Sequence, residues 1–209
     1  MSNPKPYPTE EELPCYSTVN DIDFSATYSY ADYMRFTFDE RMELIKGRLY
    51  QMSSAPSRCH QKSFGSIHNS LYNFLEGHKC EVYGAPFDVR LPRKSKEDKD
   101  IFTVIQPDVV VVCDPEKLDK RGCIGAPDIV VEILSPGNNK KELKFKYEVY
   151  EEAGVKEYWI VSISDQTFFK YILGNDGKFE PTRLLVGGEK VTTPILPGYE
   201  LDLEKVFNF

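Results

Sequence analysis

The stretch APDIVVEILSPGN, residues 126–138, decides the organisation of the chain. The aliphatic run at its centre predicts a β-strand over residues 127–134, because a short apolar run between turn residues is typical of a strand buried on both faces. Glu132 interrupts this run, and an ionised carboxylate in such a place costs free energy unless a partner compensates its charge. The stretch therefore predicts a central strand that carries a buried acid with a specific partner.

A second acid, Asp128, opens the same strand. Side chains alternate between the faces of a strand, so Asp128 and Glu132 share one face, roughly 13 Å apart at about 3.3 Å per residue. That separation is too long for both carboxylates to bind one metal ion. We therefore expect Asp128 to have a structural role, bonded to nearby backbone, and the partner of Glu132 to come from another segment.

The segment QPDVVVVC, residues 106–113, supplies the best partner. Pro107 marks the start or the edge of a strand, because proline cannot donate a hydrogen bond to a neighbouring strand. If the two strands are adjacent, Asp108 and Glu132 can direct carboxylate oxygens at one hard cation. Mg²⁺ takes oxygen ligands and keeps several waters, so two or three carboxylates are enough to hold it. The alternative for Asp108 is a purely local bond to backbone.

A helix is predicted at about residues 139–153, directly after the central strand. Tyr147 and Tyr150 belong to one apolar stripe of this helix at 3.6 residues per turn, and Lys146 lies on the border of the stripe. Lys146 can extend along the apolar face and direct its ammonium group toward the sheet, where it would neutralise a carboxylate or stabilise charge on a phosphate. The alternative is a surface lysine that pairs with Glu142, four residues earlier.

Two further side chains are candidates for the same acidic site. Glu43 lies in the first arm of a predicted hairpin, residues 42–52, and His60 lies near the start of an amphipathic helix predicted within residues 54–78. Either side chain could complete the site. A single histidine near a helix start is more often structural, so we treat both residues as accessory candidates.

The remaining segments define the fold class. Residues 1–27, rich in Pro, Glu, Ser and Thr, predict an irregular N-terminal arm, and residues 28–209 predict a single domain. The order is helix, three strands, helix and further strands, which predicts an α/β fold with a mixed β-sheet flanked by helices. The other predicted strands cover residues 80–91, 102–113, 157–163 and 167–173.

The composition limits the classes of function. The chain of 209 residues has a formal net charge of −7, which argues against a protein that holds nucleic acid mainly through a basic surface. A metal ion can still supply positive charge at one acidic cleft. No apolar run is long enough for a membrane span or a signal peptide, so we expect a cytoplasmic protein. The 5 cysteines are odd in number and lack C-x-x-C spacing, which predicts reduced thiols.

Four segments together resemble a known family. They are MELIKGRLYQMSSAPSRCHQ (42–61), QPDVVVVC (106–113), GAPDIVVEILSPGN (125–138) and KYEVYEEAGVKEYWIV (146–161). In order and spacing they resemble the Uma-type restriction endonuclease family, a former bacterial domain of unknown function within the PD-(D/E)XK nuclease superfamily. The resemblance covers about residues 28–207. It implies a restriction-endonuclease-like core that cleaves phosphodiester bonds with a metal ion.

The resemblance also assigns roles to residues. It implies that Asp108 is the aspartate of the Pro-Asp element and that Glu132 is the acid of the E-x-K element. The lysine expected two residues after Glu132 is replaced by Leu134. In the family a lysine of the following helix serves instead, and Lys146 occupies that position. An aspartate is usual four residues before that lysine, where this chain has Glu142.

The chain departs from the family in one more place, since Gly137 and Asn138 replace the usual Ser-Thr-like pair. We therefore hypothesise an endonuclease that hydrolyses DNA with Mg²⁺ or Mn²⁺, bound by Asp108 and Glu132 with possible help from Glu43. The first alternative is a catalytically inactive binding or interaction protein on a nuclease fold. A different phosphodiesterase or hydrolase that uses the same acids is a third reading, because fold alone does not fix chemistry. A homodimer is expected only by analogy with nucleases of duplex DNA.

Overall fold

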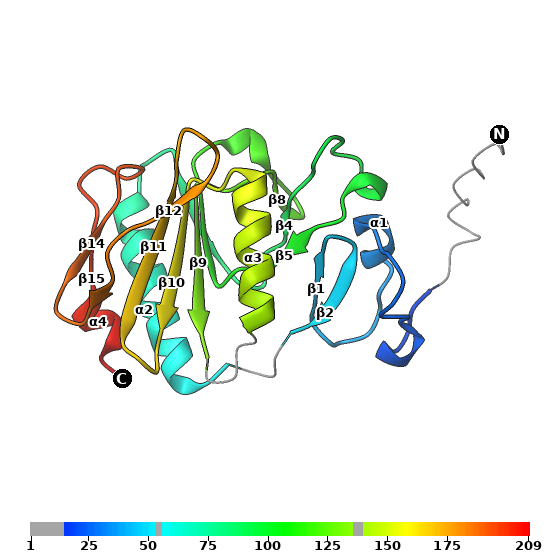
Figure 1. The fold of residues 1–209 in the computed structure, drawn as a ribbon, viewed down its shortest axis with the longest axis horizontal. Helices are drawn as coiled ribbons and strands as arrows, with labels where there is room; N and C mark the ends of the chain where they lie inside the picture. Colours follow the sequence, from blue (N-terminus) through cyan, green and yellow to red (C-terminus); the bar gives the residue numbers. More distant parts are fainter. Residues whose placement is uncertain (1–14, 53–55, 136–139) are drawn as a thin grey trace.

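The computed structural model describes residues 15–52, 56–135 and 140–209 (Figure 1). The strand predicted over residues 127–134 is the central strand of its larger β-sheet. Within these residues this sheet has the strand order β12-β11-β10-β9-β6-β3, and β13 also pairs with β11. Strand β9 runs parallel to β10 and antiparallel to β6. The strands are β3 (Glu81–Gly84), β6 (Val109–Val112), β9 (Ile129–Leu134), β10 (Glu157–Ser162), β11 (Thr167–Leu173), β12 (Phe179–Pro181) and β13 (Leu185–Val186).

Helices cover both faces of this sheet, which explains why β9 is aliphatic on both sides. Helix α2 (Arg58–Leu75) packs with α4 (Leu203–Phe207) against the face that carries Val131, and helix α3 (Lys140–Ala153) packs against the face that carries Val130. Helix α3 also connects β9 to β10, as a parallel pair requires a crossover. The hairpin of β14 (Lys190–Thr192) and β15 (Glu200–Asp202) completes the α2 side.

A second sheet lies on the other side of α3 in Figure 1. Its strand order is β2-β1-β5-β4-β8-β7. Helix α1 (Tyr30–Tyr33) and the preceding residues pack on it, with Ile22 and Tyr30 buried in the same cluster as Leu44. The strands are β1 (Met42–Ile45), β2 (Arg48–Gln51), β4 (Val89–Arg90), β5 (Val104–Ile105), β7 (Leu118–Asp119) and β8 (Gly122–Ile124); 3₁₀ turns cover Val19–Asp21, Asp98–Asp100 and Pro115–Lys117.

The two sheets are linked by the segments 80–91 and 102–113. Each was predicted as one strand, but each forms two short strands, one in either sheet. The breaks fall at Pro86 and Pro107, which cannot donate to a ladder. The Ala85 N–H donates to the Asp108 carbonyl at 3.1 Å where the two segments cross. Asp108 is therefore placed at the junction between the sheets.

The predicted α/β class with mixed sheets and flanking helices is confirmed, although the strands form more than one sheet. The described part of the predicted arm, residues 15–27, contributes Ile22 to the core beside the second sheet. Along the three described ranges, no helix has the combination of length and apolar character that crossing a membrane requires.

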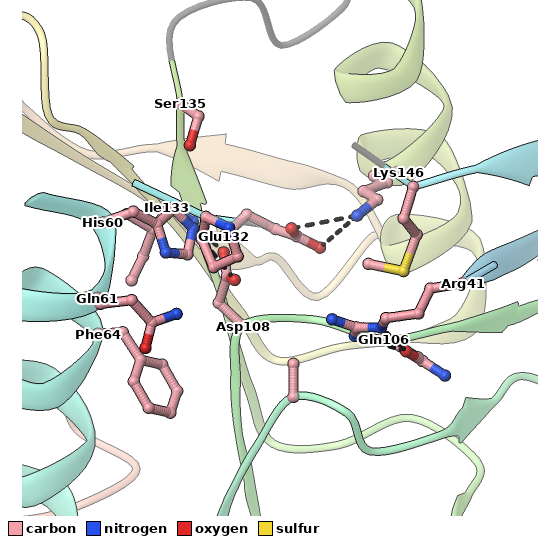
Figure 2. Close-up of a pocket in the computed structure, with 13 residues that line it drawn as sticks. Arg41, His60, Gln61, Phe64, Gln106, Asp108, Glu132, Ile133, Ser135 and Lys146 are labelled. Atoms are coloured by element: carbon pink, nitrogen blue, oxygen red, sulfur yellow. Dashed lines mark hydrogen bonds and ion pairs between the residues drawn. The ribbon is translucent and has the colours of Figure 1, made fainter. Parts of the chain in front are cut away.

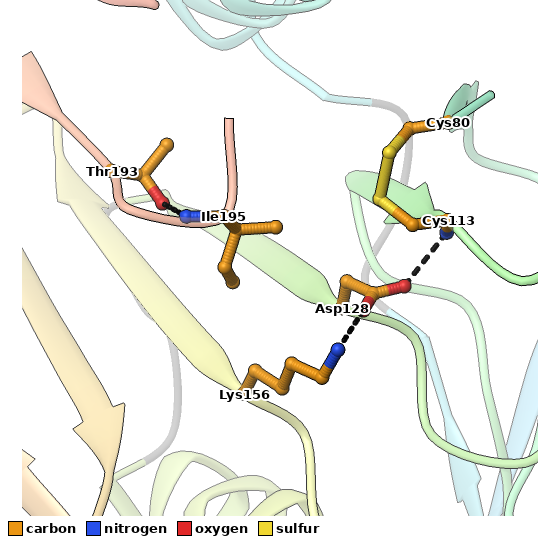
Figure 3. The surroundings of a disulfide bond; sticks show 6 residues. All are labelled: Cys80, Cys113, Asp128, Lys156, Thr193 and Ile195. Carbon is orange, nitrogen blue, oxygen red and sulfur yellow. Dashed lines mark hydrogen bonds and ion pairs between the residues drawn. A yellow bond between two sulfur atoms is a disulfide. The ribbon is translucent and has the colours of Figure 1, made fainter. Parts of the chain in front are cut away.

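The prediction that all cysteines are reduced thiols is wrong for one pair. Cys80 and Cys113 form a disulfide beside strands β3 and β6 (Figure 3). The register that pairs Glu81 with Val112 brings the two cysteines opposite each other, with Cα atoms 3.8 Å apart. Sequence spacing could not show this, because the pairing depends on which strands become neighbours. Cys15, Cys59 and Cys123 are free.

Candidate active site

Strand β9 presents Glu132 toward helix α3. The side chain is buried, with 7% of its residue surface exposed, among aliphatic neighbours that are also buried. Because β9 is central and paired on both sides, its backbone holds the Glu132 carboxylate at a fixed place at the edge of a cleft.

Asp108 lies beside Glu132 on the neighbouring strand. The register pairs Val109 with Val131, so the next position along the two chains brings Asp108 opposite Glu132. The Ile133 N–H donates to Asp108 Oδ2 at 2.7 Å, which fixes the aspartate against β9. The two acids of the predicted pair therefore project from adjacent strands and line the same cleft.

Lys146 of α3 extends to Glu132, although the lysine position on the strand itself is Leu134. Its Nζ lies 3.1 Å from Glu132 Oε1, 3.2 Å from Glu132 Oε2 and 3.0 Å from Glu43 Oε1. The side chain of Lys146 is 5% exposed, so the ammonium group lies between two buried carboxylates rather than at the surface. The side chain of Glu142, the alternative partner, lies outside the described residues, as do Gly137 and Asn138.

Glu43 is brought to the site by strand β1 of the second sheet. The hairpin turn between β1 and β2 has Lys46 and Gly47 at φ values of 50° and 79°, as a type I′ turn requires. Glu43 Oε1 accepts a hydrogen bond from the backbone N–H of Gln106 at 3.0 Å, in addition to the Lys146 contact. Glu43 thus joins Lys146 to the segment that carries Asp108.

Burial and charge shape the protonation of Glu132. Burial raises the pKa of Glu132 to about 7 from its ordinary value of 4.5, since the charged form loses its water; Lys146 acts in the opposite direction. The nearby carboxylates of Asp108 and Glu43 add to the increase. The Tyr150 hydroxyl donates to Glu132 Oε1 at 2.7 Å and favours the ionised form.

His60 completes the other wall of the cleft. It lies in the first turn of α2, where its N–H donates to the N-cap residue Ser57 at 3.2 Å. His60 Nε2 lies 3.3 Å from Asp108 Oδ1. Burial by itself would lower the pKa of His60, but the hydrogen bond and the charge of Asp108 raise it overall. The buried Nδ1 of His60 has no hydrogen-bond partner among the described residues.

Figure 2 shows Asp108, Glu132, Lys146 and His60 around one cleft, whose volume is about 150 Å³. His60 and Gln61 approach from α2, Glu132 projects from β9, and Lys146 lies across from them on α3. Arg41 and Gln106 form the side that faces the second sheet. All three residues predicted as catalytic are therefore brought together in this cleft, and Glu43 contacts one of them from below the surface.

The donor chemistry of the cleft fits a hard divalent cation. Asp108 and Glu132 supply carboxylate oxygens from adjacent strands, and Mg²⁺ completes its shell with water. In the described ranges no cluster of three or more His, Cys, Asp or Glu residues has the geometry of a metal site. Any ion would therefore be held by these two residues with waters, and Glu132 would share its oxygens between the ion and Lys146.

Asp128 is held at the other end of β9, away from this cleft. Its Oδ2 accepts from the Cys113 N–H at 2.7 Å, and its Oδ1 pairs with Lys156 at 2.6 Å (Figure 3). It joins the end of β6 to the start of β10. This arrangement agrees with the structural role expected from its distance to Glu132.

Three side chains at the site were missed by the sequence analysis. Tyr150 was assigned only to the apolar stripe, yet its hydroxyl bonds Glu132. Its position four residues after Lys146, on the same helix face, is a signal that could have identified it. Arg41 and Gln106 precede Glu43 and Asp108 by two residues each, and no pattern in the sequence distinguishes them from ordinary surface residues.

Residues 30–204 of the chain match the model of the Uma2 family, which is described as "Putative restriction endonuclease". An uncharacterized protein of Synechocystis is 26% identical over 139 residues, 66% of this chain and 69% of that protein. A crystal structure from Anabaena variabilis, described as "a putative nuclease belonging to DUF820", aligns with a TM-score of 0.68 at 16% identity. The alignment covers 86% of this chain and 97% of that chain.

Proposed function

The chain belongs to the Uma2 family, and from that premise we propose that it is a metal-dependent endonuclease of the PD-(D/E)XK type that hydrolyses phosphodiester bonds in DNA. The observation that supports the proposal most strongly is the reach of Lys146 to Glu132. Leu134 stands where a lysine is expected two residues after the strand acid Glu132, and a lysine from helix α3 supplies the cation beside this acid instead. A purely structural acid would not need a second carboxylate, Glu43, on the same ammonium group.

In the proposed mechanism, Asp108 and Glu132 would hold a Mg²⁺ or Mn²⁺ ion. When bound, the ion supplies Lewis acidity toward a phosphate oxygen and lowers the pKa of a bound water. The Ile133 N–H holds Asp108 in place, and the Tyr150 hydroxyl holds Glu132. These bonds preorganise the two acids before substrate arrives.

Lys146 would act on the substrate directly. Its ammonium group can donate to the attacking water or to a non-bridging phosphate oxygen, where negative charge increases in the transition state. Glu43 orients the ammonium group through the 3.0 Å contact and is itself fixed by the Gln106 N–H. His60 lies at the rim, where it can donate to Asp108 Oδ1 and keep that carboxylate oriented. We add a homodimer to the proposal for duplex substrates, by analogy with nucleases of duplex DNA, which often use two active sites.

One observation favours an inactive binding protein on the same fold. Both oxygens of Glu132 already have protein partners, Lys146 and Tyr150, so binding of an ion must compete with these contacts. In that case the cleft would be a structural ion-pair cluster.

Cleavage of plasmid and of circular single-stranded DNA separates the two functions. With Mg²⁺ or Mn²⁺ we expect the wild-type chain to nick or linearise DNA and to lose this activity in chelator. The variants Glu132→Gln and Lys146→Met should be inactive, while Lys156→Met, which removes the lysine that pairs with Asp128, should cut like wild type. No cleavage by the wild type with either metal, or equal cleavage by all variants, would contradict the proposal.

A further inference from the structure

A second cavity adjoins the proposed active site. It has a volume of about 270 Å³, and it shares two lining residues, Arg41 and Gln106, with the cleft of Asp108 and Glu132. One part of the remaining wall is aromatic, formed by Tyr33, Phe36 and Phe38. The two cavities are therefore neighbouring compartments that meet at Arg41 and Gln106.

The aromatic wall is already assembled. The rings of Phe36 and Phe38 stack with centroids 5.3 Å apart and planes 19° apart. The ring centroid of Tyr33 lies 5.6 Å from that of Phe36. The Tyr33 hydroxyl donates to the carbonyl of Met42 at 2.9 Å, which fixes that ring against strand β1. Preformed ring faces of this kind are suited to stack against another flat ring, as nucleobases do on aromatic side chains.

Arg41 is held where the two compartments meet. Its Nε and Nη2 both donate to Gln106 Oε1, at 3.2 Å and 2.7 Å. Gln106 Nε2 in turn donates to Asp88 Oδ1 at 2.9 Å, which sets the orientation of the amide. Arg41 Nη1 has no hydrogen-bond partner within the described ranges, and the guanidinium faces the cleft in Figure 2. It can therefore bind a phosphate without first breaking a bond.

Charge determines which part of a nucleotide fits on which side. The aromatic compartment is also lined by Asp39 and Glu40, which repel phosphate. Arg41, which lines both cavities, attracts it. A nucleotide is accommodated with its phosphate at Arg41 and its uncharged base against Phe38, where the acidic side chains can accept hydrogen bonds from amino groups of the base.

We propose that this aromatic compartment binds an unpaired nucleobase of DNA beside the cleft in which a phosphodiester bond is cut, while Arg41 binds the phosphate of that nucleotide. The inference rests on the proposed function, because it takes DNA as the ligand of the adjacent cleft. A base within a duplex is already stacked on both faces, so the site selects single-stranded DNA or a base turned out of a duplex. Arg41 is a substrate-binding residue in this account.

The test uses binding in chelator, so that it does not depend on cleavage. A short single-stranded oligonucleotide that contains 2-aminopurine is titrated with the full chain, and fluorescence anisotropy gives the affinity. We expect quenching of 2-aminopurine at one position of the oligonucleotide. Loss of one base–aromatic stack should weaken binding roughly 5- to 100-fold in Phe38→Ala and in Phe38→Leu, which keeps apolar volume. The control is Phe102→Ala, which removes an exposed ring that does not line either compartment.

An abasic site at the quenched position provides a measurement that does not depend on the folding of a variant. It should weaken binding to the wild-type chain as much as Phe38→Ala does, and the two changes together should not add. Additive effects of the two changes would overturn this inference but not the proposed function. The same holds if the oligonucleotide binds and is cut, but 2-aminopurine is not quenched and the abasic site has no effect. Binding with these properties but no cleavage with Mg²⁺ or Mn²⁺ would instead overturn the proposed function and support the base site.

Discussion

The two ends of strand β9 each bury a carboxylate that pairs with a lysine. Asp128 at the first end is 3% exposed and Glu132 near the last end is 7% exposed. Their partners differ, since the side chain of Lys156 is 62% exposed and that of Lys146 is only 5% exposed. At the first end the lysine serves one acid, whereas at the last end Lys146 serves both Glu132 and Glu43.

The surroundings of the two acids explain this difference. Asp128 is satisfied by the Cys113 N–H and Lys156 beside a disulfide, so its bonds connect strands. Glu132 borders an open cleft opposite Asp108, where charges are concentrated beyond what connecting the strands requires. A buried acid alone therefore does not distinguish a structural from a catalytic position, and the proposed active site rests on the buried lysine that two acids share at the cleft.

The largest expected effect is on the rate of catalysis, which should distinguish Lys146 from Lys156. Lys146→Met should lower kcat for DNA cleavage roughly 100- to 1,000-fold, as for the loss of one preorganised donor to the transition state. Lys156→Met should leave kcat unchanged. Single-turnover cleavage of plasmid DNA measures both, with cooperative urea unfolding to show that each variant is folded.

Equal activity of the Lys146→Met and wild-type chains would remove Lys146 from the mechanism. If Lys146→Met does not fold, because a buried carboxylate is left without its cation, Glu132→Gln replaces it in the comparison. That variant keeps the shape of the side chain and removes its charge.

The next effect is on stability and belongs to the other end of β9. Asp128→Ala leaves the Cys113 N–H without its acceptor, which should lower the free energy of unfolding by about 1–3 kcal/mol. Asp128→Asn keeps an acceptor oxygen and should cost less. Urea denaturation measures both values. If Asp128→Asn remains folded but loses cleavage activity, the structural role is contradicted.

A third prediction uses pH. The folded-state pKa of Glu132 is raised to about 7, above its ordinary value of 4.5, so the folded chain binds this proton more tightly than the unfolded chain. Between these two values stability should fall as pH rises. Glu132→Gln lacks this titration, so the free energy of unfolding of the variant relative to wild type should increase from about pH 4.5 to 7. If the difference in the free energy of unfolding between the variant and the wild type stays constant across this pH range, the burial of a titrating Glu132 is contradicted.

The smallest effect concerns Tyr150. Tyr150→Phe removes the 2.7 Å bond to Glu132 Oε1 and should lower the free energy of unfolding by roughly 0.5–1.5 kcal/mol. Because this bond favours the ionised acid, its loss should also move the titration of Glu132 to higher pH. Carboxyl-carbon NMR of the metal-free chain measures the midpoint. An unchanged midpoint would show that the hydroxyl does not hold the charged form.

Much of this arrangement could be predicted from local patterns. The aliphatic run around Glu132 predicted the central strand, and the helical stripe placed Lys146 at the edge of the apolar face. Both depend on periodicity within one segment, which the sequence displays directly. The resemblance to the family then related Asp108, Glu132 and Lys146 to one another, although their roles remain predictions.

What could not be predicted depends on contacts between segments. The disulfide of Cys80 with Cys113 requires the pairing of β3 with β6, and the bond from the Gln106 N–H to Glu43 requires the meeting of the two sheets. The break at Pro86 was also missed. Pro107 was assigned to the start or the edge of a strand, but the separate strand of the other sheet before it was not predicted, because proline at a strand edge and proline between two strands look alike in sequence.

The most direct test of the account is isothermal titration of Mn²⁺ into four chains: wild type, Asp108→Asn, Glu132→Gln and Asp128→Asn. We predict that the wild type and Asp128→Asn bind the ion with similar affinity and that Asp108→Asn and Glu132→Gln do not. No binding to the wild type, or equal binding to Glu132→Gln, would contradict the assignment of the metal site to the cleft end of β9.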